Sequence, residues 1–160
     1  MSERFDRTIA YYNRNPLNIR FANNTKWQGQ IGVDKGFVKF TDFQWGYRAA
    51  VKILRSYHLR GIRSIGAIIE TWAPRTENDT KSYIKAVLNY LNGVWAIEPP
   101  EYCAKTQINL KDREEVVNLL MAMTRVEMGA KIQHLQILKP NAYIGYDLAV
   151  TSKDFFSGIK

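Results

Sequence analysis

The chain has 160 residues, of which 23 are Lys or Arg and 15 are Asp or Glu, so its formal charge is +8. Hydrophobic residues make up 46% of the sequence and charged residues 24%, which excludes a disordered or fibrous chain. At this length we expect one domain over residues 1–160 with a full hydrophobic core. A lone Cys103 and two histidines, His58 and His134, exclude a disulfide framework and a multi-cysteine zinc site. No metal and no cofactor is therefore expected.

The sequence contains no apolar run near the roughly 18 residues that span a bilayer, and its N-terminus lacks the apolar core of a secretory signal. We therefore predict a soluble protein that is made inside the cell. The positive charge favours a polyanionic partner, such as nucleic acid, anionic lipid or the acidic polymers of a cell wall. It equally suits simple solubility. Nucleic-acid binding ranks last among the functions considered, because the basic residues are scattered and form no dense run.

The first third of the chain predicts a short helix followed by a β-hairpin. The helix is expected over residues 3–12, before a loop that contains Pro16. Residues 17–40 hold several turn-forming pairs, and residues 37–40 alternate apolar with polar side chains as a short strand does. The sequence thus predicts a small β-hairpin lobe near residues 17–40.

The rest of the chain has apolar residues at helical spacing. The expected helices cover about residues 42–60, 65–72, 80–92, 112–128, 132–138 and 153–156. Ser64 is expected to cap the second, and Asp79 or Thr80 the third, while glycines end several of them. Two tryptophans of this part, Trp45 and Trp72, are assigned to the core. The predicted class is mainly α (α+β).

One carboxylate interrupts an apolar pattern in the helix predicted near residues 112–128. Four residues lie along one line of that helix: Val116, Leu120, Met123 and Glu127. Desolvation and the negative end of the helix dipole are both expected to raise the pKa of Glu127. A carboxyl group that stays partly neutral near pH 7 is what a general acid requires. The alternative is a solvated glutamate that pairs with Arg125 or Lys131.

Three segments of the chain form a recognisable set of motifs. The first begins at residues 15–20, Asn-Pro-Leu-Asn-Ile-Arg, and continues through Trp-Gln-Gly-Gln at 27–30 and Gly-Tyr-Arg-Ala at 46–49. The second is Ile-Ile-Glu-Thr-Trp-Ala-Pro at residues 68–74, and the third is Ala-Met-Thr-Arg-Val-Glu-Met-Gly at residues 122–129. In this order they resemble a family of phage virion-associated proteins, which includes structural proteins and lysozyme-like peptidoglycan hydrolases. The resemblance covers most of the chain.

The first two segments are also distantly similar to bacterial cell-wall N-acetylglucosaminidases. In those enzymes an Asn-Leu-Phe-Gly-Ile-Lys motif leads into a tryptophan-bearing hairpin beside the cleft, and the catalytic glutamate precedes the hairpin. Here the Glu-x-Gly sequence, at Glu127, follows it. The resemblance implies a lysozyme-like helical domain whose catalytic helix has moved to the C-terminal side, as in a circular permutation. The phage family usually has His-Glu-Asn-Gly where this chain has Val-Glu-Met-Gly, which either raises the pKa of Glu127 further or marks lost activity.

The function that the resemblance implies is that of a peptidoglycan-cleaving glycosidase of phage origin, a lytic transglycosylase or a muramidase. The alternative is a non-catalytic virion structural protein with a lysozyme-like fold. The candidate catalytic residues are Glu127, as general acid/base, with Glu77 and Tyr83. The candidate substrate-binding residues are Asn15, Asn18, Arg20, Trp27 and Gln28.

Hydrolysis normally uses two carboxylates. The sequence contains no two carboxylates whose spacing identifies them as such a pair, which favours a transglycosylase with one catalytic glutamate. Glu77 has the alternative role of a helix cap, and Tyr83 fits an apolar helix face equally well. The implied partners are peptidoglycan glycan strands and other virion proteins. The implied locations are the virion or the bacterial cytoplasm, with action at the cell wall.

Overall fold

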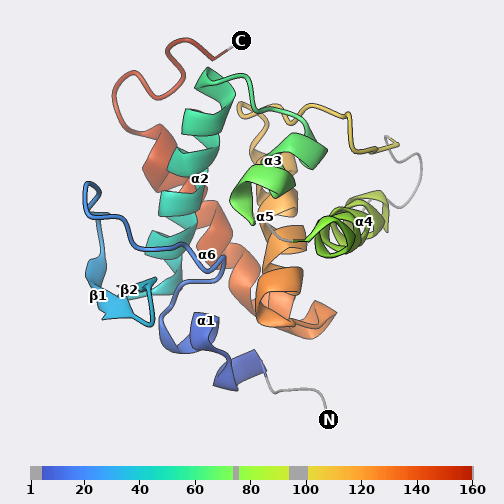
Figure 1. Ribbon diagram of the computed structural model, residues 1–160. Helices are drawn as coiled ribbons and strands as arrows, with labels where there is room; N and C mark the ends of the chain where they lie inside the picture. The colour runs from blue at the N-terminus through green and yellow to red at the C-terminus, as the bar shows by residue number, and fades with distance from the viewer. Residues whose placement is uncertain (1–4, 74–75, 94–100, 160) are drawn as a thin grey trace.

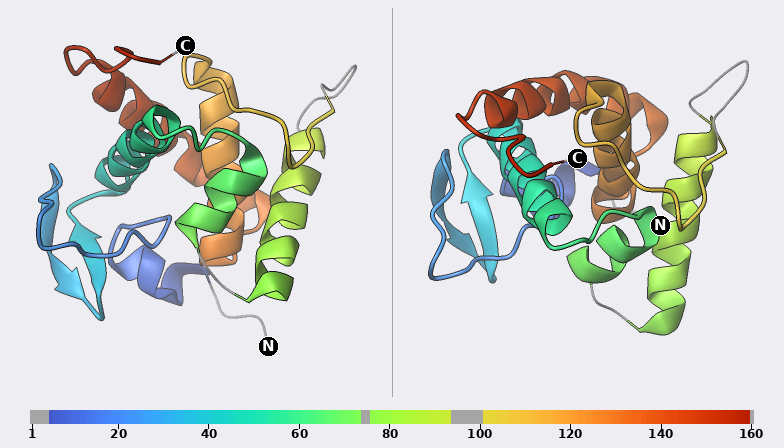
Figure 2. Two further views of the ribbon diagram at one scale, coloured as in Figure 1. Left: turned by 45° about the horizontal axis from the view of Figure 1, so that its top comes forward. Right: turned by 90° about the horizontal axis from the view of Figure 1, so that it is seen from above.

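The computed structural model describes residues 5–73, 76–93 and 101–159, with the backbone alone for Glu77 and Asn78. Within these residues the chain forms six α-helices and one two-stranded antiparallel sheet, which confirms the predicted mainly α (α+β) class (Figure 1). In chain order the elements are a 3-10 turn (Phe5–Arg7), α1 (Ile9–Tyr12), β1 (Gln30–Asp34), β2 (Phe37–Phe40), α2 (Phe43–Leu59), α3 (Ile65–Trp72), α4 (Glu77–Gly93), α5 (Arg113–Met128) and α6 (Ile132–Val150). The hairpin lies at one side of the molecule and α4 at the other (Figure 2).

The N-terminal helix predicted over residues 3–12 is wrong as a single element, as far as the structure describes that segment. Thr8 divides it, because its backbone is extended (φ −74°, ψ 155°) and its hydroxyl oxygen accepts the Tyr11 N–H at 3.2 Å. A threonine in this geometry is an N-cap, so a new helix begins after it. The result is a 3-10 turn followed by the four-residue helix α1.

The hairpin lobe near residues 17–40 is confirmed. Lys35 and Gly36 both have positive φ, 51° and 85°, which is the conformation of a type I′ turn and suits the twist of a two-residue hairpin. The segment before β1 adds a third, short extended stretch, because Val38 N donates to Ile19 O at 3.0 Å and Phe21 N donates to Gly36 O at 2.9 Å. The lobe therefore consists of β1, β2 and the stretch around residues 19–21.

A buried asparagine holds this lobe together. Asn15 is fully buried, and its side-chain amide donates to Ile19 O and Val38 O, both at 2.9 Å. Its side-chain oxygen accepts the Ile19 N–H, also at 2.9 Å. Since a buried backbone group without a partner is costly, these three bonds fix residues 15–19 against β2.

The cap predicted at Ser64 is confirmed, because its side chain accepts a backbone N–H at the start of α3. Asp42 and Asp112 act in the same way at the starts of α2 and α5. The start predicted for α4, with Asp79 or Thr80 as cap, is wrong. Thr76 takes that place, because its side-chain oxygen accepts the Asp79 N–H at 3.3 Å and its carbonyl accepts the Thr80 N–H at 3.0 Å.

Helix α6 is longer than predicted. The expected helix over residues 132–138 continues through Pro140 to Val150, and residues 153–156 form turns where a helix was expected. Proline lacks the N–H of the helical ladder and usually ends a helix, so Pro140 disfavours this continuation. Tertiary packing overrides that preference, because α6 lies against both α2 and α5 and buries residues along most of its length.

Two glycines allow α2 to meet its neighbours at close range. A Cβ atom at Gly145 of α6 would lie 2.6 Å from Tyr47 Cβ and 2.7 Å from Arg48 N. A Cβ atom at Gly46 would lie 2.7 Å from Pro16 Cδ. Helix α2 is therefore in direct contact with α6 on one side and with the segment before the lobe on the other.

The core between α2 and α5 contains one buried polar pair. The Tyr47 hydroxyl lies 2.9 Å from the Thr124 hydroxyl, which also donates to Leu120 O at 2.7 Å. Both side chains are fully buried, and burial raises the pKa of Tyr47 well above its ordinary value. The phenol is therefore neutral and serves packing.

Candidate functional site

A groove of about 390 Å³ opens where the hairpin lobe faces α2 and the C-terminal ends of α3 and α5. Its lining residues are Asn18, Ile19, Arg20, Phe37, Ile53, Tyr57, Trp72, Ala73 and Glu127. Four of them come from the lobe, two from α2, and Glu127 from the last turn of α5. The chain thus brings together segments that are far apart in the sequence.

Glu127 stands at the end of the apolar stripe that the sequence predicts. Leu120 and Met123 are fully buried, whereas Glu127 is half-buried and faces the groove. Gly129 ends the helix in the left-handed conformation, with φ 63°. The raised pKa expected for Glu127 remains a prediction.

The hairpin lobe is attached directly to this helix end. The Asn18 side-chain amide donates to the backbone carbonyl oxygen of Glu127 at 3.3 Å. Asn18 itself has φ 52°, a conformation that asparagine tolerates better than most residues. One predicted substrate-binding residue therefore lies in the groove beside the predicted catalytic glutamate.

Aromatic side chains form the wall of the groove opposite the lobe. The ring centroids of Tyr57 and Trp72 lie 6.1 Å apart, with the rings nearly perpendicular. The Trp72 indole N–H donates to Leu17 O at 3.2 Å. The assignment of Trp72 to the core is wrong in part, since this side chain is half-buried and lines the groove. Tyr57 is buried, so the part of the Trp72 indole that lines the groove is the surface that suits stacking against a sugar ring.

Arg20 supplies a positive charge on the lobe side. Its guanidinium lies 4.7 Å from the centre of the Phe37 ring, and the residue is exposed. Within the described part of the chain no carboxylate forms an ion pair with Arg20. The described lining of the groove therefore presents one carboxylate, Glu127, and one cation, Arg20, among aromatic side chains.

Among the described side chains, four other predicted site residues lie outside the lining of this groove: Asn15, Trp27, Gln28 and Tyr83. Asn15 is buried with its amide fully engaged, as described above, and Tyr83 is buried on α4. Trp27 is half-buried and Gln28 exposed in the loop before β1. Glu77 is the first residue of α4, and its side chain lies outside the described part of the structure.

Sequence reasoning did not assign Tyr57, Ile53, Phe37 or Ala73 to the site. The sequence carried one indication for this wall: Trp72 and Ala73 stand at a helix end just before a proline, where a side chain is less enclosed. Among the described lining residues Glu127 is the only acid, and Glu70 is exposed on α3 outside the groove. The described residues also contain no group of three or more His, Cys, Asp or Glu side chains that could hold a metal ion.

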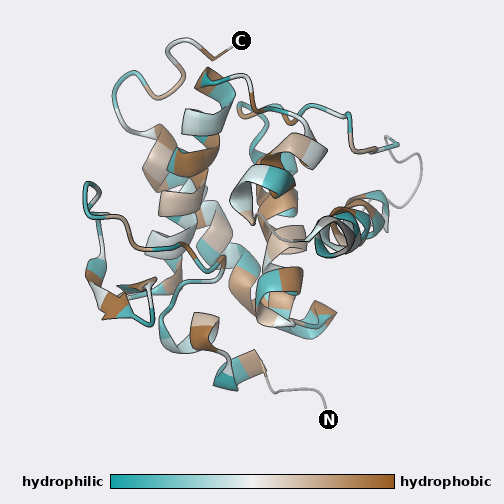
Figure 3. Cartoon of the chain, in the orientation of Figure 1, coloured by the Kyte–Doolittle hydropathy of each residue, from teal (hydrophilic) through white to brown (hydrophobic). Residues whose placement is uncertain are grey.

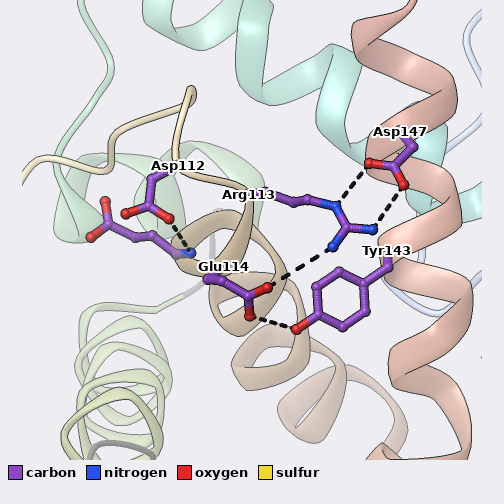
Figure 4. Close-up of polar contacts among 6 residues, drawn as sticks. Asp112, Arg113, Glu114, Tyr143 and Asp147 are labelled. Atoms are coloured by element: carbon purple, nitrogen blue, oxygen red, sulfur yellow. Dashed lines mark hydrogen bonds and ion pairs between the residues drawn. The ribbon is translucent and has the colours of Figure 1, made fainter.

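A second polar cluster lies at the junction of α5 and α6 (Figure 4). Arg113 donates to both carboxylate oxygens of Asp147, at 2.9 and 2.8 Å, and its guanidinium lies 4.3 Å from the centre of the Tyr143 ring. The Tyr143 hydroxyl donates to Glu114. The hydrogen bond from Arg113 lowers the pKa of Asp147, and burial together with Glu114 raises that of Tyr143 to about 12. The cluster therefore joins α5 to α6.

Comparison with known proteins relates the chain to a bacteriophage protein. No model of a known protein family matches it. Protein P5 of Pseudoalteromonas phage PM2 is 42% identical to it over 82 residues, a match that covers 48% of this chain and 51% of the phage protein. The matching part thus spans about half the length of that relative. No helix in the described residues is both long and apolar enough to cross a membrane.

Proposed function

We propose that this chain is a peptidoglycan-cleaving glycosidase of phage origin, with Glu127 as its general acid/base. The observation that supports the proposal is the position of Glu127, half-buried in a groove between the hairpin lobe and the aromatic pair Tyr57 and Trp72. A glycan strand offers ring faces for the aromatic side chains, and the wall peptides that it carries offer carboxylates for Arg20. The similarity to a phage protein supports the origin.

The single acid of the described groove favours a lytic transglycosylase over a hydrolase. In that reaction the Glu127 carboxyl donates its proton to the glycosidic oxygen between N-acetylmuramic acid and N-acetylglucosamine, and the bond to the anomeric carbon breaks. The carboxylate then accepts the proton of the sugar's own hydroxyl as that oxygen closes an anhydro ring on the anomeric carbon. A muramidase would need a second carboxylate, for which Glu77 is the candidate.

The proposal includes a single lysozyme-like domain over residues 1–160, in which the catalytic helix α5 follows the lobe. A virion-associated protein of this kind would meet peptidoglycan strands at the cell wall and other virion proteins within the particle. Tyr83, Asn15, Trp27 and Gln28 would then support the fold around the groove rather than contact the scissile bond.

The second candidate function is that of a non-catalytic phage structural protein with the same fold. Two observations favour it: the relative is a phage protein, and the described groove holds one carboxylate whose neighbours Val126 and Met128 are apolar. Such a protein would use the groove to bind wall polymer or a neighbouring subunit.

Glu127→Gln separates the two functions. Wild-type protein is expected to solubilise purified sacculi, and Glu127→Gln to lose that activity with an unchanged thermal unfolding midpoint. Glu70→Gln, which removes an exposed carboxylate outside the groove, serves as the matched control and should stay active. If wild type and Glu127→Gln are equally inert on sacculi of several wall types, the structural function replaces the enzymatic one.

Fragment analysis then distinguishes the two reactions. Anhydro ends in the released fragments are expected by mass spectrometry. Reducing ends, together with loss of activity in Glu77→Gln, would identify a hydrolase instead.

A further inference from the structure

The hairpin lobe, residues 17–40, is strongly positive. It contains four cations and one acid, so its formal charge is 4 − 1 = +3. The cations are Arg20, Lys26, Lys35 and Lys39, and the acid is Asp34. All four cations are exposed, and none forms an ion pair with a carboxylate of the described residues. This charge is therefore available to a partner.

The lobe holds these cations on a defined backbone. Lys35 occupies the type I′ turn, and Lys39 lies on β2 between the buried residues Val38 and Phe40, so it points away from the core. Lys26 lies in the loop before β1. The bonds of Asn15 keep the lobe in place, so the charges are positioned before a partner arrives.

Apolar side chains are exposed among these cations. Phe21, Ile31 and Val33 have exposed fractions of 40%, 58% and 46%. The apolar colour of the hairpin at the side of the molecule is visible in Figure 3. A surface that combines fixed cations with apolar contact area is typical of a binding surface rather than of a solvated edge.

We infer that the lobe is a docking surface for a carboxylate-bearing glycan polymer, which it holds next to the groove. The inference rests on the proposed function for its choice of polymer. Arg20 and Phe37 belong to both the lobe and the lining of the groove, so a strand bound in the groove continues onto the lobe. The carboxylates of the wall peptides match the positive charge, while sugar ring faces match the exposed apolar side chains.

The test compares two triple variants in the Glu127→Gln background, where cleavage cannot disturb binding. One variant carries Lys26→Gln, Lys35→Gln and Lys39→Gln. The matched control carries Lys105→Gln, Lys111→Gln and Lys153→Gln, three exposed lysines outside the lobe. Both lower the formal charge by three. Binding to purified sacculi and to uncharged chitin is measured by co-sedimentation at two salt concentrations, with thermal unfolding as the check on folding.

The lobe variant is expected to bind sacculi about tenfold more weakly, whereas the control changes less than about threefold. Binding to sacculi should fall with salt and exceed binding to chitin. Equal losses in the two variants would show an effect of net charge alone and overturn the inference. Tighter, lobe-dependent binding of duplex DNA or of anionic lipid vesicles would also overturn it, in favour of that ligand.

The inference and the proposed function can fail separately. If wild-type protein does not cleave sacculi but the lobe variant loses binding to them, the enzymatic proposal fails and the docking surface stands. If wild type cleaves and both triple variants bind equally, the docking surface fails and the enzyme stands.

Discussion

Asn18 and Glu127 are joined by a hydrogen bond from the Asn18 side-chain amide to the Glu127 carbonyl oxygen, 3.3 Å long. This bond connects the hairpin lobe with the last turn of α5, the two parts that face each other across the groove. The carbonyl groups of a terminal helical turn lack partners within the helix, so a side-chain donor stabilises that end. The position of Glu127 relative to the lobe thus depends on Asn18.

Asn18→Ala is expected to destabilise the protein by about 1–3 kcal/mol, because it removes this bond and places alanine at a positive φ. Asn18→Gly removes the same bond, but glycine tolerates the backbone conformation, so this variant should lose less stability than Asn18→Ala. Urea unfolding of the two variants measures the difference. Equal stability of both variants and wild type would show that the bond contributes nothing.

Trp72→Ala is expected to weaken binding of soluble peptidoglycan fragments about fivefold or more, because the indole lines the groove. Trp27→Ala is the matched control, since Trp27 is also half-buried but lies outside the lining. Equilibrium binding in the Glu127→Gln background is the measurement. A larger loss in Trp27→Ala would place the binding surface on the loop before β1.

The sequence predicted the elements whose determinants are local. Ser64 caps α3 as predicted, α5 begins directly after Asp112 near the predicted start, and Lys35 and Gly36 form the turn of the predicted hairpin. The length of α6 was missed, because packing against two helices overrides the local effect of Pro140. A single sequence records such long-range packing only weakly.

The candidate site shows the same difference between local and long-range determinants. The apolar stripe that ends at Glu127 follows from the helical period alone, so the sequence predicts it. The aromatic wall depends on how the end of α3 meets α2 and the lobe, which is a tertiary relationship. For this reason the sequence places Trp72 in the core and predicts Trp27, rather than Trp72, as the substrate-binding tryptophan.

Gly145→Ala is expected to destabilise the protein by about 1–3 kcal/mol or more, because the new methyl group would overlap Tyr47 and the α2 backbone. Gly32→Ala is the control, since a Cβ atom there meets nothing within 4 Å. That variant should stay within about 0.5 kcal/mol of wild type. Thermal and urea unfolding measure both, and equal stabilities would contradict the close contact of α2 with α6.

Asp147→Asn is expected to lower stability slightly at neutral pH, since the ion pair with Arg113 is partly exposed. Because the hydrogen bond from Arg113 lowers the pKa of Asp147 in the folded protein, the contribution is fully present above the unfolded pKa of about 3.9. It is lost as the pH falls through the lower, folded pKa. The difference in unfolding free energy between wild type and variant should therefore shrink below about pH 4, and a constant difference down to pH 2 would contradict this.

Gly46 and Gly145 are constrained by the close packing of α2, whereas Glu127 is constrained by the proposed reaction. Any related chain that keeps the two close contacts of α2 must retain both glycines, whatever residue stands at position 127. Relatives that preserve the glycine pair but replace the glutamate would have kept the fold without the proposed acid. The three positions together therefore distinguish conservation of the fold from conservation of the proposed catalytic group.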